Sequence, residues 1–293
     1  MERLRFSYGL GLLCFVLLCC FSCEKPVGED DAEAKDMVRL TVNIGSNYAQ
    51  VPFGMKRQDE MKPIGELCTR LDVALFEGNS KVRTLSMERK DDSFGHFELK
   101  MAKGVYTLVI LGHRGDGAAT ITRPDSIRFY KNKITDTFYA CRRLNVTGDS
   151  SLTVDLERAV AAFRLDIEDA TPADVKVMEF HYTGGSSTLD AVAGVGCVNS
   201  RQTEDFNVEA GAYEGKSSYT IFTFPRANSD KLKVTVTALD KDKRKIAEKE
   251  FDDVPAVVKQ KYVFTGNFFS SGDGGDSFII RGNDEWAEKH QTY

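Results

Sequence analysis

The sequence predicts an all-β protein made of two consecutive antiparallel β-sandwiches. Apolar and polar residues alternate with a period of two in many short runs, which is the pattern of strands with one buried face. Turn-forming residues separate these runs, and no longer segment shows the 3.6-residue period of an amphipathic helix. This spacing is typical of antiparallel sandwiches and not of alternating strands and helices.

The first half of the folded chain contains four alternating runs. They lie at residues 38–44, 71–75, 106–110 and 152–156. Glycine-containing turns lie between them at residues 77–79, 103–104 and 148–149. One helical turn is expected at residues 63–67. We therefore predict a first sandwich over residues 37–157.

The second half contains six such runs and a charged hairpin turn. The runs lie at residues 163–167, 178–182, 222–224, 232–238, 246–251 and 262–264, and the turn is at 241–243. We place the boundary between the halves near Glu157–Arg158, so that each half is large enough to bury its own core. The second sandwich then spans residues 158–293, with a flexible tail from about residue 270 and helix-forming residues at 284–290.

Residues 1–22 are predicted to be an export signal peptide. Arg3 and Arg5 precede an apolar run that is too short for a membrane-spanning helix. A small residue, Ser22, stands before Cys23, and this arrangement resembles a bacterial lipoprotein signal, in which the cysteine becomes the first residue and carries the lipid. Cys20 and Phe21 depart from that pattern, because their positions are usually held by a small aliphatic and a small residue. An ordinary secretory peptide cut nearby is the alternative.

Residues 23–36 are acidic and are predicted to form a tether before the first strand. Two interpretations stay open: a solvated tether, or a segment that resembles the acidic export tag by which Bacteroidetes lipoproteins reach the cell surface. Acyl chains on Cys23, at roughly 0.8 kcal/mol per buried CH₂, would hold the protein durably in the outer membrane. The whole chain has 39 Lys and Arg against 44 Asp and Glu, a net charge of −5, which argues against a nucleic-acid partner.

No motif for catalysis, a cofactor or a metal stands out. The four histidines lie far apart without metal-ligand spacing. Gly194 and Gly196 lack the third glycine of a phosphate-binding loop, and we interpret the surrounding residues 183–200 as one long polar loop. The glycines and aspartates of residues 270–277 lack the ligand spacing of an EF-hand and are interpreted as a flexible linker.

Three cysteines remain after Cys23, and no two of them form a CxxC pair. They are Cys68, Cys141 and Cys197. Either one disulfide forms, with Cys68 and Cys141 as the favoured pair, or all three are buried free thiols.

Three segments carry a resemblance to a known family. Residues 231–269 contain a strand that ends in Ala-Leu-Asp, a charged turn, and a last strand that closes on Thr-Gly-Asn-Phe-Phe. Together with residues 104–112 and 158–165, this order resembles the FimB/Mfa2 family of Bacteroidales fimbrial subunits. The resemblance implies two transthyretin-like sandwiches in a lipid-anchored fimbrial component that assembles by strand exchange without catalysis. Family members include basal anchors as well as accessory and tip-like subunits, and the sequence leaves this role open.

Strand exchange needs a donor and an acceptor. Beyond the glycine-rich linker, Phe278, Ile279 and Ile280 form a short β-prone segment that is a candidate donor strand. The alternative is a terminal strand that packs on its own domain. In stalk-type relatives the strand equivalent to residues 38–44 is clipped after an arginine, and Arg57 is a candidate for that processing. A retained strand leaves the acceptor groove filled.

The sequence therefore favours a non-enzymatic surface lipoprotein that anchors or decorates a fimbria, with other fimbrial subunits and surface ligands as partners. A glycan-binding surface lipoprotein is the alternative, and it needs coplanar exposed aromatic side chains beside polar groups. Tyr182, Tyr213, Tyr219 and Trp286 are the aromatic residues considered for stacking, and strand positions explain most of them. A hydrolase would need converging acid and base groups, and the sequence selects no such pair.

Overall fold

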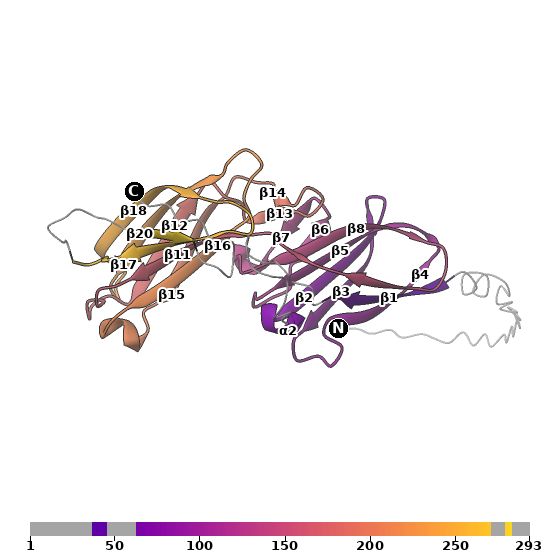
Figure 1. Ribbon diagram of the computed structural model, residues 1–293, viewed down its shortest axis with the longest axis horizontal. Helices are drawn as coiled ribbons and strands as arrows, with labels where there is room; N and C mark the ends of the chain where they lie inside the picture. Colours follow the sequence, from indigo (N-terminus) through magenta and orange to yellow (C-terminus); the bar gives the residue numbers. More distant parts are fainter. Residues whose placement is uncertain (1–36, 46–62, 271–278, 283–293) are drawn as a thin grey trace, which may run out of the picture. The chain divides into compact units, whose positions relative to one another are not determined.

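The computed structural model describes residues 37–45, 63–270 and 279–282, and it shows a fold that consists almost entirely of β-strands (Figure 1). The one α-helix within these described residues is the turn α2 (Ile64–Leu67), where the sequence predicts it. Two short 3-10 turns, η1 (Tyr130–Asn132) and η2 (Ala210–Tyr213), are the other helical elements in this part of the chain. The all-β prediction is confirmed. The described residues from Val38 onward belong to one compact unit.

Two sheets build the N-terminal half. The first has the order β4-β1-β9, with β1 (Met37–Ile44), β4 (His96–Ala102) and β9 (Ser150–Val154). The second has the order β10-β8-β5-β2-β3, with β2 (Arg70–Glu77), β3 (Ser80–Glu88), β5 (Gly104–His113), β8 (Phe138–Val146) and β10 (Glu157–Arg158). Their shared core contains the inward side chains of β1, among them Val42, which is fully buried. The alternation of apolar and polar residues at 38–44 therefore reflects the burial of one face of β1.

The five-stranded sheet is buried on both faces. On β5, Leu108 and Ile110 pack into the core shared with β1, whereas Val109 and Leu111 pack into a separate cluster on the opposite face. All four side chains are inaccessible to solvent. Strands covered on both faces have nearly continuous apolar sequences, and residues 108–111 read Leu-Val-Ile-Leu.

Two four-stranded sheets build the C-terminal half. One has the order β16-β11-β19-β20, with β11 (Ala161–Ile167), β16 (Ser217–Thr223), β19 (Lys261–Gly266) and β20 (Ile279–Gly282). The other has the order β15-β12-β17-β18, with β12 (Val177–Thr183), β15 (Arg201–Asn207), β17 (Lys231–Leu239) and β18 (Lys245–Pro255). The ring of Phe163 lies 5.0 Å from that of Phe264 and 6.4 Å from that of Phe180, so aromatic contacts join the two sheets.

Each half contains one parallel strand pair among its antiparallel pairs. β1 runs parallel to β9, and β11 runs parallel to β19. In both halves the first long strand thus pairs with a strand from the end of the same half. These pairs close each half on itself, because the residues that they join lie about 100 positions apart in sequence.

Residues 183–200 are not simply a loop, and that interpretation is wrong in part. They contain β13 (Thr188–Asp190) and β14 (Val195–Gly196), which join β6 (Thr120–Arg123) and β7 (Ser126–Arg128) in a sheet of order β14-β13-β7-β6. These strands are only two to four residues long, so they give no clear alternation. The sheet belongs to the cluster that covers the second face of β5, where the rings of Phe129 and Phe224 lie 5.3 Å apart. The domain boundary near Glu157–Arg158 stays a prediction.

Candidate functional site: the sheet edges and strand β20

The edges of the sheets are the parts of this fold that can pair with another chain. An edge strand has a row of backbone N–H and C=O groups without a neighbouring strand. In the C-terminal half, one sheet ends in β16 and β20 and the other ends in β15 and β18. These four strands differ in how open they are.

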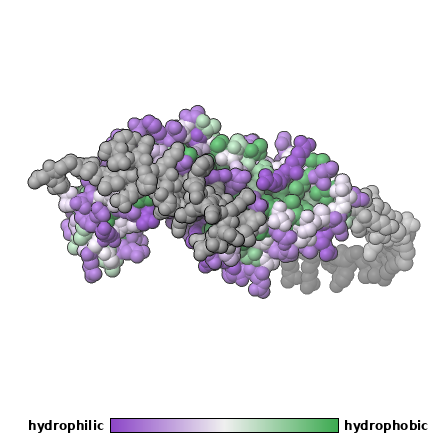
Figure 2. Space-filling view, in the orientation of Figure 1, coloured by the Kyte–Doolittle hydropathy of each residue, from purple (hydrophilic) through white to green (hydrophobic). Residues whose placement is uncertain are grey.

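β18 is protected against pairing by charge and by irregular geometry. Lys233 on β17 contacts Glu250 on β18 with a 2.6 Å ion pair, and Lys245 contacts Glu248 at 2.9 Å. The register between β17 and β18 also shifts twice. Among the coloured residues at the left of the visible face in Figure 2, most are hydrophilic. Charged side chains and bulges are the devices by which edge strands avoid unintended pairing.

β20 covers the edge of β19. The two strands are antiparallel, with Thr265 opposite Ile279 and Phe264 opposite Ile280. β19 is therefore paired on both sides, with β11 on its other side. Four residues are a short strand, and β20 is reached only through the glycine-rich residues 271–278. The pairing geometry is that of strand addition within one chain.

A carboxylate fixes the chain just before the linker to β20. Asp169 accepts hydrogen bonds from the backbone N–H groups of Phe268, Phe269 and Ser270 at 2.7–2.8 Å, and from the Ser270 hydroxyl at 3.0 Å. Burial opposes ionisation of Asp169, but these donors outweigh it and hold the pKa of the carboxyl below its ordinary value. Asp169 and residues 268–270 thus form a clamp that fixes the chain between β19 and the linker to β20.

Most of the residues singled out from the sequence lie outside the described residues. This holds for the lipidation candidate Cys23, the processing candidate Arg57 and the first donor residue, Phe278. Ile279 and Ile280 lie in β20, paired with β19 of the same chain. None of the helices in the described part of the chain is long and apolar enough to span a membrane.

The one buried histidine–carboxylate pair among the described residues is already fully hydrogen-bonded. His113 Nε2 donates to Asp72 Oδ2 at 2.8 Å, and both side chains are at most 3% exposed. The other ring nitrogen, Nδ1, accepts the Gly115 N–H at 3.0 Å, so no lone pair is left to act as a base. Ser86 and the Ala119 N–H also donate to the Asp72 carboxylate. This cluster contributes to stability. Its signal in the sequence is one polar residue in each of two apolar strands, Asp72 in β2 and His113 in β5.

The remaining candidate groups do not converge. Across residues 37–45, 63–270 and 279–282, no three His, Cys, Asp or Glu side chains are grouped so that they could hold a metal ion. Cys68, Cys141 and Cys197 are free, so the disulfide between the first two is not formed. Cys68 packs in the core shared with β1, whereas Cys141 packs against the cluster on the other face of the five-stranded sheet. Burial raises the pKa of the Cys68 thiol to about 12.

An aromatic platform for sugars is not seen in the described part of the chain. Tyr182 and Tyr219 are buried in the C-terminal core, and Trp286 lies outside the described residues. Tyr130, which is 49% exposed, is the one aromatic among the large exposed apolar side chains found there. A single ring does not supply the coplanar set that the glycan-binding alternative needs.

Comparison with solved structures finds similar folds. A candidate adhesin from Bacteroides ovatus has a TM-score of 0.50 and 13% identity, covering 76% of this chain and 85% of its own. The fimbrial anchor protein Mfa2 from Porphyromonas gingivalis has a TM-score of 0.45 and 10% identity, with coverages of 87% and 100%. A fimbrial assembly protein from Parabacteroides distasonis has a TM-score of 0.44 and 10% identity, with coverages of 87% and 98%. No curated protein matches the chain.

A family model matches the sequence directly. It describes the fimbrillin-A associated anchor proteins Mfa1 and Mfa2, and the match runs from residue 33 to residue 292. The resemblance drawn from the sequence motifs is therefore confirmed. Since this match extends over nearly all of the sequence, the chain belongs to the family of fimbrillin-A associated anchor proteins Mfa1 and Mfa2.

Proposed function

We propose that the protein is a non-enzymatic, cell-surface lipoprotein that acts as an anchor or accessory subunit of a fimbria. Its family supports a fimbria-associated role. The leader that ends at Cys23 supports export and lipid attachment to the outer membrane. The acidic residues 23–36 would separate the folded part from the membrane. The matching family model describes anchor proteins, and we propose such a place for this chain.

The subunit associates with other fimbrial subunits by β-strand addition, with β20 as the donor. The pairing of β20 with the outer edge of β19 carries this proposal. A donor strand must be extended and joined through a permissive linker. β20 is extended and follows the glycine-rich residues 271–277. In the unassembled subunit it covers its own edge, and on assembly it pairs with a partner.

The state of β1 sets which end of the fibre the subunit can occupy. β1 lies between β4 and β9, and its side chains Val38, Leu40 and Val42 are buried in the core. While β1 is in place, this sheet has no vacancy for a donor strand. Cleavage after Arg57 would allow β1 to leave and would open a groove beside β9. With β1 retained, the subunit can only start a fibre or stand alone.

Immunoprecipitation from the producing cells tests this function. A tag can be inserted at Gly148, a turn glycine with open space where a side chain would lie. This position leaves both ends of the chain free. Fimbrial subunits should co-purify with the tagged protein and should be lost from an Ile279→Asp/Ile280→Asp variant. Ile246→Asp on the exposed side of β18 is the matched control and should retain them. Full recovery with the double variant would refute donation by β20, and polysaccharide porins in place of fimbrial subunits would favour glycan capture.

A further inference from the structure

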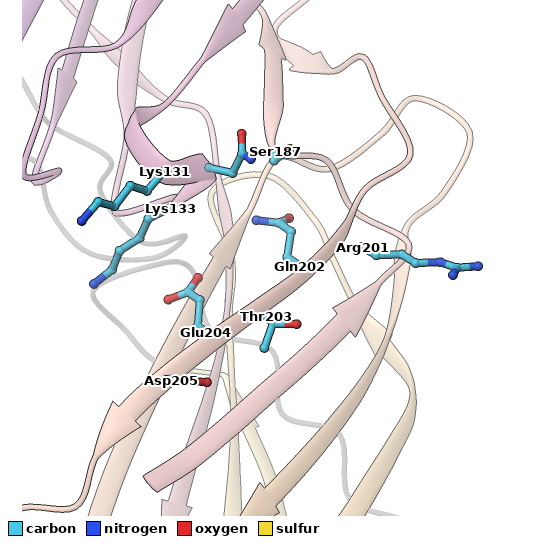
Figure 3. A pocket seen from close by; sticks show the side chains of 9 residues that line it. Lys131, Lys133, Ser187, Arg201, Gln202, Thr203, Glu204 and Asp205 are labelled. Atoms are coloured by element: carbon cyan, nitrogen blue, oxygen red, sulfur yellow. The ribbon is translucent and has the colours of Figure 1, made fainter. Parts of the chain in front are cut away.

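A hollow of about 370 Å³ lies beside β15, at the edge of the second C-terminal sheet. Its walls are the turn at η1 and five consecutive residues of β15 (Figure 3). The lining residues are Lys131, Asn132, Lys133, Ser187 and 201–205. Neither the fold nor strand donation by β20 uses this hollow, because β20 belongs to the other sheet.

Gln202 brings an unpartnered amide to this hollow. The residue is only 7% exposed, and within the described structure neither its Nε2 nor its Oε1 has a hydrogen-bond partner. In Figure 3 its side chain lies among the side chains of Ser187, Lys133 and Glu204. Buried polar groups in native proteins nearly always have partners, and a buried amide without one is costly. The arrangement therefore points to a partner that the described residues do not supply.

The backbone of β15 presents a second row of groups toward the same side. Within the described sheets, β15 pairs with β12 alone. The backbone N–H of Val208 donates to the carbonyl oxygen of Lys176, next to β12. The backbone N–H and C=O groups of the even-numbered residues of β15 therefore point toward β12. By the alternation of an antiparallel ladder, Arg201, Thr203 and Asp205 then direct their N–H and C=O groups away from β12. These groups form an open edge along the hollow.

The shape of the surface fits an elongated ligand. A second hollow of about 530 Å³ shares Asp205 with the first and continues past Phe206 and Asn207 to Tyr219 on β16. The two hollows therefore follow β15 from one end to the other. An extended peptide can pair with a row of backbone groups over this length, whereas a compact small molecule cannot.

The charge at the Gln202 end favours an acidic ligand. Lys131 and Lys133 both line the hollow and extend to the same side of it in Figure 3, whereas Arg201 extends away. Two acidic residues, Glu204 and Asp205, also line the hollow. Oε1 of Glu204 accepts the hydroxyl of Tyr182 at 2.7 Å, and burial raises the pKa of this carboxyl, which favours its neutral form. Two ammonium groups next to an amide are a favourable site for a carboxylate.

We propose that the open edge of β15 binds an extended, acidic peptide segment of a partner protein. The segment adds as a strand to Arg201, Thr203 and Asp205, one of its peptide or side-chain amide groups bonds to Gln202, and an acidic side chain contacts Lys131 and Lys133. This site is independent of strand donation, since it accepts a strand and lies on the other sheet from β20. A partner could therefore be bound at β15 while β20 stays on β19.

Fluorescence anisotropy with a defined probe tests this proposal on the full mature chain. The probe is a capped, fluorescein-labelled heptapeptide in which glutamate alternates with valine. Gln202→Leu should weaken binding at least about tenfold, and Lys131→Glu/Lys133→Glu should weaken it to a similar extent. Lys241→Glu/Lys243→Glu, in the remote hairpin turn, is the matched control and should change binding less than about twofold. Gln202→Leu should not lower the thermal unfolding midpoint, because it removes an unpartnered amide.

Two further peptides separate the parts of the proposal. Replacement of the glutamates by lysine should abolish binding through charge, and a central proline should abolish it by removing a ladder N–H. No binding of the acidic probe, or equal binding of the lysine or proline peptide, would overturn the proposal. In that case the inward polar residues of β15 would serve to protect the edge from pairing. An unchanged affinity of the Gln202→Leu variant would overturn the role of the amide.

Discussion

Replacement of Asp169 by alanine should destabilise the C-terminal half and loosen β20. The carboxylate accepts four hydrogen bonds, three of them from consecutive backbone N–H groups at 268–270. A hydrogen bond to a charged group contributes about 1.5–3 kcal/mol when it is buried. Asp169 is only partly buried, so water replaces much of what is lost, and we expect a total of about 2 kcal/mol. At this chain length the midpoint of thermal unfolding should fall by about 3–4 °C.

Chemical denaturation and amide hydrogen exchange measure the two effects of this change. The β20 amides should exchange faster in Asp169→Ala than in the wild type, because the start of the linker is no longer fixed. Asp169→Asn keeps one oxygen acceptor and should lie between the two. A loss below about 0.5 kcal/mol together with unchanged exchange of β20 would refute the clamp, since surface substitutions commonly have effects of that size.

The clamp also predicts a pH dependence with a definite sign. The pKa of Asp169 in the folded protein lies below its ordinary value of 3.8. The stability that it contributes is therefore complete above the unfolded pKa and is lost as the pH falls through the folded pKa. The difference in stability between the wild type and Asp169→Asn should be constant near neutral pH and should shrink below pH 3.8. A difference that grows on acidification would contradict the assigned hydrogen bonds.

Three other predictions follow from the anchor and the buried groups. Cys23→Ala should move the protein from the membrane fraction to the soluble fraction, and unchanged membrane retention would rule out lipidation at this residue. His113→Leu should destabilise the fold by about 1.5–3 kcal/mol in denaturant titrations, because it removes the Nε2–H donor from the buried Asp72 carboxylate; a loss below about 1 kcal/mol would argue against this pairing. Iodoacetamide at pH 8 should label the exposed Cys197 and spare Cys68, whose thiol has a pKa of about 12; labelling of Cys68 in the folded protein would contradict its burial.

The sequence predicts strands well where one face of the strand is buried and the other is exposed to solvent. β1 shows this, because its alternation matches the buried and exposed positions of residues 37–44. It predicts less where both faces are buried, since the apolar run in β5 does not say what covers its second face. β15 gives no strand signal, because Gln202 and Glu204 take inward positions that apolar residues usually fill. The polar side chains that hide this strand are the same ones that line the hollow beside it.

The sequence does not predict sites whose residues are far apart along the chain. Asp72 and His113 are 41 residues apart, and Asp169 binds backbone groups about 100 residues further along the chain. Spacing along the chain carries no information on such pairs, because β-sheet register brings them together. The candidate donor strand was found because a donor is defined by local features: a β-prone segment, a permissive linker and a place near the chain end.

A reversible lock between β19 and β20 tests the proposed assembly most directly. Thr265 and Ile279 are opposite each other in the register, so Thr265→Cys/Ile279→Cys should form a disulfide that holds β20 on its own sheet. Cys197→Ser removes the exposed thiol, and Thr237→Cys/Glu248→Cys between β17 and β18 is the control pair. If β20 is the donor strand, fimbrial subunits will co-purify with the locked protein only after reduction, and with the control pair in either state. Equal recovery of fimbrial subunits by the oxidised, locked protein would contradict it.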